Sequence, residues 1–154
     1  MSITVSWDNA EKTVIYYAFD GSWDWDDFDA AFEQSVTMTE SVEHYVHIIA
    51  DLRNSDSLPD GALLYIRRVM RVIPPNRGKI VVLGGGKNVK ILMDMATRIY
   101  KKIAHRFIVV DDLTDAYVAL RIAPNAHRLS EETENTNLPK RRAVSLASIA
   151  ALFS

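Results

Sequence analysis

Two short segments carry the residue types best suited to binding chemistry. Trp23 and Trp25 flank Asp24, and an indole ring can either stack on a ligand or pack in a core. Side chains two residues apart cannot share one face of a helix, so we expect one indole in the core and the other over a surface groove. The second segment is Gly84-Gly85-Gly86-Lys87, where free backbone amides before a helix can donate hydrogen bonds to an anion. It matches neither the Walker motif nor GxGxxG, which makes a simple turn the more economical interpretation.

Catalytic and metal chemistry has few candidates in this sequence. The chain has no cysteine, which excludes disulfides, thiolate catalysis, cysteine-ligated zinc and iron–sulfur clusters. The acidic cluster from Asp20 to Asp29 lacks the pattern of a calcium-binding loop, and no GxSxG nucleophile elbow occurs. Metal-ligand spacing is also lacking among the histidines, His44, His47, His105 and His127. The sequence therefore predicts a protein that is not an enzyme and uses neither a metal nor a cofactor.

Composition indicates one globular domain. The 154 residues are 48% hydrophobic and 25% charged, which allows a sizeable core in a soluble protein. The net charge of -2 lacks the basic excess that nucleic-acid binding usually requires. Residues 1–60 carry a balance of -11 and residues 61–154 one of +9, a hint of self-association or of a charged partner. Because neither a membrane-spanning run nor a signal peptide is visible, we expect a cytoplasmic location.

The hydrophobic periodicity predicts alternating strands and helices that would position these segments. Period-two or continuous apolar runs predict strands at 3–7, 13–19, 45–50, 79–83 and 107–110. Helical spacing predicts helices at 24–36, 63–73, 89–103 and 112–120. Asp24 and Asp112 are suitable N-caps, and Pro74 ends the second helix. The order ββαβαβαβα predicts an α/β domain over residues 1–120 with a mixed, mainly parallel sheet of four or five strands.

The remainder of the chain differs in composition. Residues 121–142 lack periodicity and end in Lys140-Arg141-Arg142, which predicts a polar linker. Residues 143–154 are apolar again and predict a short C-terminal helix. Since an apolar helix on a tether needs a surface to cover it, we expect it to dock on its own domain or on a second subunit. On this basis we predict a homodimer.

One stretch resembles a known family. Ile48-Ile49-Ala50-Asp51-Leu52-Arg53-Asn54, followed by the residues from Ser55 to Leu63, resembles the strand, loop and helix of STAS domains. The resemblance is closest to the SpoIIAA-like branch, also described as STAS/SEC14-like. It covers roughly residues 3–120, including the strand at 79–83 and the helix start at 112–116, and it does not extend to the tail.

The resemblance implies two functions. The first is a regulatory protein-interaction module, as in anti-sigma-factor antagonists, with an unknown regulatory protein as partner. Its partner-binding loop would consist of Arg53, Asn54, Ser55, Asp56, Ser57, Asp60 and Gly61. In the antagonists a phosphorylated serine precedes the glycine, whereas Asp60 occupies that place here, so the phosphorylation switch is not expected.

The second implied function is that of a SEC14-like carrier or sensor of a small apolar or anionic ligand. The corresponding cleft would include Trp23, Trp25, Tyr65, Gly84, Gly85, Gly86 and Lys87. A carrier should contain an apolar pocket of about 300 Å³ or more. An interaction module, by contrast, should lack an enclosed cavity.

Overall fold

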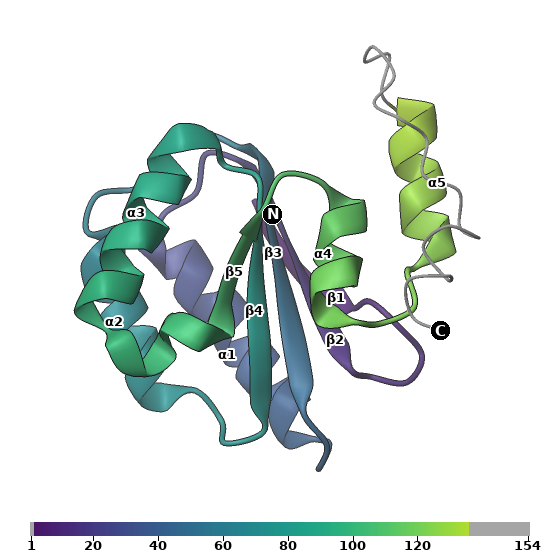
Figure 1. The fold of residues 1–154 in the computed structure, drawn as a ribbon, viewed down its shortest axis with the longest axis horizontal. Coiled ribbons are helices and arrows are strands. Elements are labelled where there is room, and N and C mark those ends of the chain that lie inside the picture. The colour runs from purple at the N-terminus through teal and green to yellow at the C-terminus, as the bar shows by residue number, and fades with distance from the viewer. Residues whose placement is uncertain (1, 136–154) are drawn as a thin grey trace.

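The computed structural model describes residues 2–135, in which a five-stranded sheet separates two layers of helices (Figure 1). The strands follow the sheet order β1-β2-β3-β4-β5. Their bounds are β1 Ile3–Trp7, β2 Val14–Gly21, β3 Val46–Ser55, β4 Arg77–Leu83 and β5 Phe107–Val110. Only the β1–β2 pair is antiparallel, and the other three pairs are parallel. This confirms the predicted α/β class with a mixed, mainly parallel sheet.

The helices divide unequally between the two faces. Their bounds are α1 Trp25–Glu40, α2 Ala62–Val72, α3 Gly86–Ile99, the 3-10 helix η1 Lys101–Arg106, α4 Leu113–Leu120 and α5 Ala126–Asn135. Strands β2 to β5 are added in sequence order, and right-handed crossovers therefore place α1, α2 and α3 on the same face. Helix α4 covers the opposite face, with α5 beyond it (Figure 1).

Two predicted helix starts are confirmed in detail. The Asp24 side chain accepts a hydrogen bond from the Asp27 backbone N–H, and Asp27 returns one to the Asp24 backbone, which forms a capping box. The Asp112 side chain accepts in the same way from the Asp115 N–H at the start of α4. These caps satisfy amides that a helix start would otherwise leave unpaired.

The apolar core has two parts, one on each face of the sheet. The part under α1, α2 and α3 includes Ile15, Tyr17, Phe19, Trp23, Val46, Ile48, Leu52, Val82 and Met93. The part under α4 includes Val14, Tyr16, Ile49, Val81, Leu83, Leu113, Ala116, Tyr117 and Leu120. The alternation along each strand thus sends successive side chains to two different cores.

Several predicted boundaries were wrong. Strand β3 continues to Ser55, five residues past the expected end, because Asp20 and Gly21 of β2 still pair with Asn54 and Ser55. Helix α3 begins at Gly86 rather than residue 89 and ends at Ile99, where η1 takes over.

The prediction of a polar linker over 121–142 also fails in part. Residues 126–135 form α5, and the Asn125 side chain accepts a hydrogen bond from the Arg128 backbone N–H in its first turn. The predicted C-terminal helix at 143–154 and the basic triplet at 140–142 lie outside the described residues. Among residues 2–135, no helix has the length and apolar character required to cross a membrane.

Candidate ligand-binding site

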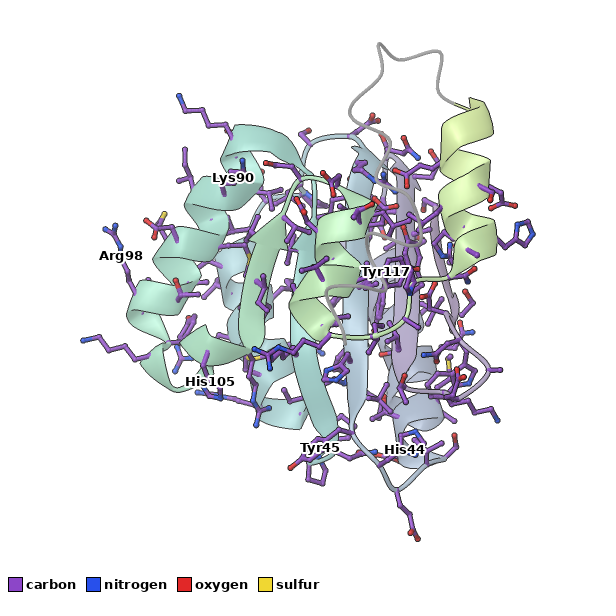
Figure 2. The ribbon with its side chains drawn as sticks, turned by 45° about the vertical axis from the view of Figure 1, so that its right-hand side comes forward. His44, Tyr45, Lys90, Arg98, His105 and Tyr117 are labelled. Carbon is purple, nitrogen blue, oxygen red and sulfur yellow. The ribbon has the colours of Figure 1, made fainter. Side chains whose placement is uncertain are left out.

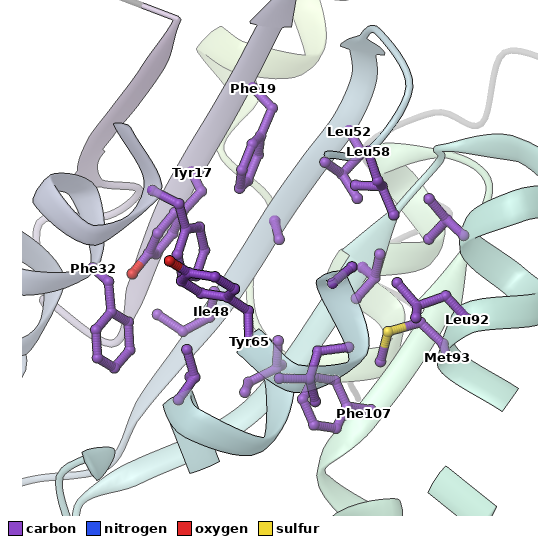
Figure 3. A pocket seen from close by; sticks show the side chains of 18 of the residues that line it. Tyr17, Phe19, Phe32, Ile48, Leu52, Leu58, Tyr65, Leu92, Met93 and Phe107 are labelled. Atoms are coloured by element: carbon purple, nitrogen blue, oxygen red, sulfur yellow. The ribbon is translucent and has the colours of Figure 1, made fainter. Parts of the chain in front are cut away.

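An apolar cavity of about 150 Å³ lies between the sheet and helices α1, α2 and α3 (Figure 3). From the strands it is lined by Tyr17, Phe19, Ile48, Ala50, Leu52, Val82 and Phe107. From the helices it is lined by Trp25, Phe28, Phe32, Tyr65, Ile66, Met70, Leu92 and Met93. Its volume is about half of what was expected for a carrier, and its apolar character is as expected.

The two tryptophans belong to one aromatic cluster at this cavity. Trp23 is buried and Trp25 half-buried, and their ring centroids are 5.2 Å apart in an edge-to-face arrangement. Trp25 stacks on Tyr65 of α2 with a centroid separation of 4.0 Å and an interplanar angle of 9°. The expectation of one indole in the core is met by Trp23, while the half-buried Trp25 lines the cavity. The two rings nevertheless touch, because Trp23 precedes the helix and its direction is not set by helical spacing. Trp23, Trp25 and Tyr65 thus come together as predicted for the cleft.

Hydrogen bonds tie this cluster to the predicted partner-binding loop. The Trp23 indole N–H donates to Ser55 Oγ at 2.8 Å, and the Trp25 indole N–H donates to the Asp60 carbonyl at 2.7 Å. Arg53, Asn54 and Ser55 are residues of β3 rather than of a loop, which corrects their predicted placement. The segments proposed for two different functions are therefore parts of one continuous structure.

Helix α2 covers the cavity without burying any residue fully. Its inward side chains, Ile66, Val69 and Met70, line the cavity and are only half-buried. At its first turn Gly61 has φ +86°, a left-handed conformation that favours glycine, and supplies no side-chain cap. The Trp25–Tyr65 stack is consequently a main contact that holds this cover against α1.

A second, polar pocket of about 180 Å³ lies at the carboxyl ends of β3 and β4. It brings Arg53, Ser55, Asp56 and Ser57 together with Gly85, Gly86 and Asn88. It shares Leu52, Leu58 and Val89 with the apolar cavity, so the two spaces adjoin.

The other predicted site residues line neither space. Asn54, Asp60, Gly61 and Lys87 are exposed. Gly84 instead packs against the polar pocket's arginine, since a Cβ at Gly84 would come within 2.5 Å of Arg53 Cγ.

Arg77 is the site residue that the sequence analysis missed. This first residue of β4 lines the apolar cavity and is 3% exposed. Its Nη2 donates to Thr39 Oγ1 at 3.2 Å, whereas its Nε has no hydrogen-bond partner among the residues that the structure describes. Burial lowers the pKa of the Arg77 guanidinium, and its interaction with the Tyr17 hydroxyl opposes that shift. The only advance signal was an arginine next to a predicted buried strand, which is too common to single it out.

The opposite face of the sheet holds a network of paired charges. Asp51 accepts two hydrogen bonds from the Arg53 guanidinium, at 2.9 and 3.0 Å, and a third from the Tyr16 hydroxyl. Arg53 also pairs with Glu132 of α5. Burial opposes ionisation of Asp51, but the bonds from Arg53 and Tyr16 outweigh it, so the pKa of Asp51 is lowered.

A second part of this network joins the turn after β1 to α4 and α5. The side chain of Asp8, almost completely buried, accepts from Arg128 Nε at 2.7 Å and from the Tyr117 hydroxyl at 2.8 Å. Figure 2 shows Tyr117 on the side of α4 that faces the sheet. Burial and then the Asp8 carboxylate raise the pKa of Tyr117, which keeps this phenol a hydrogen-bond donor. Each of these charges already has a partner, and the arrangement serves to hold α5 in place.

His44 and His47 each form a hydrogen bond with a backbone group that is distant in the sequence. The predicted placement of His47 in a strand is confirmed, and its Nδ1 accepts from the Lys79 backbone N–H at 2.9 Å. His44 Nε2 lies 2.8 Å from the Lys12 carbonyl. Within residues 2–135, no group of three or more metal-ligating side chains is close enough to hold an ion.

No protein-family model matches this chain, and no curated protein matches it. The resemblance to STAS domains therefore stays a prediction. The site is characterised by its geometry alone: an apolar cavity with one buried arginine in its wall, and a polar pocket beside it.

Proposed function

We propose that this protein binds a small, largely apolar ligand in the cavity under α2 and acts as a carrier or sensor rather than as an enzyme. The observation that supports the proposal is the cavity itself, which is lined almost entirely by apolar side chains. In a close-packed interior such a space costs stability, because the atoms lining it lose packing contacts. A ligand that fills it would restore them.

The volume limits the size of the ligand. Pockets for drug-sized molecules usually measure about 300 Å³ or more. Apolar cavities of about 150 Å³ stay free of water and admit a single small ring. A one-ring compound or a short alkyl chain is therefore the appropriate ligand class. The cavity is partly open, and α2, which has no fully buried residue, is its least tightly packed wall.

Calorimetric titration with benzyl alcohol and hexanol tests the proposal. We expect saturable binding to the wild-type chain and its loss in Ala50→Leu, because Ala50 lines the cavity and a larger side chain would fill it. Ala119→Leu is the matched control, since Ala119 packs on the opposite core and its variant should still bind. A wild-type chain that binds neither probe would refute the proposal.

A STAS-like, SpoIIAA-like identity belongs to the same proposal, together with a cytoplasmic location. It is supported by the order of elements and by the strand-to-loop segment that precedes α2. The regulatory interaction module implied by that identity ranks second, because an interaction surface does not require the apolar cavity under α2. If it applies, Asp60→Arg should abolish capture of the regulatory partner, and an unchanged capture would count against it.

One observation favours self-association as a second function of the structure. Ile91, Met95 and Ile99 form an exposed apolar stripe on α3 at four-residue spacing. Lys90 and Arg98 extend from the same helix (Figure 2). A homodimer through this stripe predicts twice the chain mass by light scattering and a monomer for Ile91→Asp with Ile99→Asp. A wild-type monomer at high concentration would contradict it.

A further inference from the structure

Arg77 carries a buried positive charge with no acidic partner in the described part of the chain. It is 3% exposed, and the ion pairs of residues 2–135 do not include it. Its guanidinium meets two neutral hydroxyl groups, those of Thr39 and Tyr17. A buried charge without a partner is costly, and arginines in protein interiors are normally matched by a carboxylate.

The same arginine has an unused donor and borders the cavity. Its Nε is buried and has no hydrogen-bond partner within residues 2–135. A guanidinium offers its Nε–H and one Nη–H side by side, in the geometry that binds both oxygens of a carboxylate. A carboxylate would therefore supply both the hydrogen-bond acceptor and the negative charge that Arg77 lacks in the described part of the chain.

We propose that the ligand of the apolar cavity is a small carboxylic acid, with its carboxylate on Arg77 and its apolar body among the aromatic side chains. This inference rests on the proposed function and narrows its ligand to one-ring aromatic acids and short-chain fatty acids. Among residues 2–135, the cavity lining contains no second basic side chain, which favours a monoanion over a phosphate dianion. The apolar body lies among Tyr17, Phe32 and Ile48, which surround the space in Figure 3.

The test compares each acid with its neutral alcohol. Wild-type protein is titrated with hexanoate and hexanol, and with benzoate and benzyl alcohol. We expect each carboxylate to bind about tenfold more tightly than its alcohol, the effect of a charge-assisted hydrogen bond. Arg77→Met keeps the length of the side chain without its charge, and it should lose this preference while still binding the alcohols. Arg67→Met is the matched control, because Arg67 is exposed on α2 and its variant should keep the preference.

A measurement on the unaltered protein covers the case in which Arg77→Met does not fold. The Nε–H NMR signal of Arg77 should shift downfield when hexanoate is added and stay in place with hexanol. Equal affinity of acid and alcohol would overturn the inference but leave apolar binding intact. Loss of both would overturn the proposed function as well. A preference that persists in Arg77→Met would place the carboxylate elsewhere, and would refute the role of Arg77.

Discussion

The two faces of the sheet differ in how their buried charges are paired. On the α4 face, Asp8 is matched by Arg128, and Asp51 by Arg53. On the α1–α3 face, the guanidinium of Arg77 is buried and, among residues 2–135, contacts hydroxyl groups without a carboxylate, beside an apolar cavity. In the described part of the chain, one face of the sheet thus has its buried charges paired, and the other has a cavity and an arginine without a counter-charge. The contrast indicates that a bound molecule would contribute most packing and charge pairing on the α1–α3 face.

The helices differ in the same sense. Helix α4 buries Leu113, Ala116, Tyr117 and Leu120 almost completely within eight residues. Helix α2 has eleven residues and buries none of them fully, although its inward side is apolar. Helix α4 is therefore densely packed on its face, whereas α2 covers the other face without a fully buried residue.

The largest expected effect tests this difference in packing. Leu113→Ala should lower the free energy of unfolding by about 2–5 kcal/mol, because the side chain is 1% exposed and leaves a cavity in a dense core. Ile66→Ala on α2 should cost only about 1 kcal/mol, since Ile66 is half-buried over a space that already exists. Urea unfolding followed by circular dichroism measures both. Equal losses would show that the two faces are packed alike.

A second test removes one arginine from the α4 face. Arg128→Met should lower the free energy of unfolding by about 3 kcal/mol, because the almost fully buried Asp8 carboxylate loses its counter-charge and keeps only the Tyr117 bond. The same urea unfolding experiment applies. If Arg128→Met left the free energy of unfolding unchanged, solvent rather than Arg128 would balance the charge of Asp8.

The same change on the other face should have the opposite sign. Arg77→Met should raise the free energy of unfolding of the ligand-free protein by about 1 kcal/mol, because methionine avoids the cost of an unpaired buried charge. The measurement is again urea unfolding, now in the absence of carboxylic acids. A large loss of stability would show that the hydroxyl contacts of Arg77 are sufficient, and the contrast between the faces would disappear.

The elements could be predicted from the sequence where the signals are local. Apolar runs located the strands, and the carboxylates of Asp24 and Asp112 marked two helix starts because a cap is formed within three residues. The end of β3 could not be predicted, since its last residues are held by distant partners in β2. Helix α5 was missed for the same reason, because its Arg128 is held by a hydrogen bond to Asp8, 120 residues away in the sequence.

The candidate site was predictable only in its aromatic part. Trp23 and Trp25 could be selected from the sequence because tryptophan is a common ligand-stacking residue. Tyr65 was grouped with them through the family resemblance. Arg77 has no comparable signal, because its meaning depends on the absence of a nearby carboxylate. Whether a carboxylate lies near Arg77 depends on the packing of distant segments, and no short stretch of sequence can show it.

The smallest expected effect is in acid and concerns the α4 face. Folding lowers the pKa of Asp51, so its stabilisation is fully present above the ordinary carboxyl pKa of about 3.9 and is lost as the pH falls through the lower value of the folded state. Asp51→Asn should therefore flatten the decline of stability below about pH 5, measured by urea unfolding at a series of pH values. Arg77→Met is the control from the other face, and it should keep the wild-type acid slope because a guanidinium stays protonated throughout this range. If Asp51→Asn retained the full slope, Asp51 would not be a source of acid sensitivity, and the paired charges would matter for geometry alone.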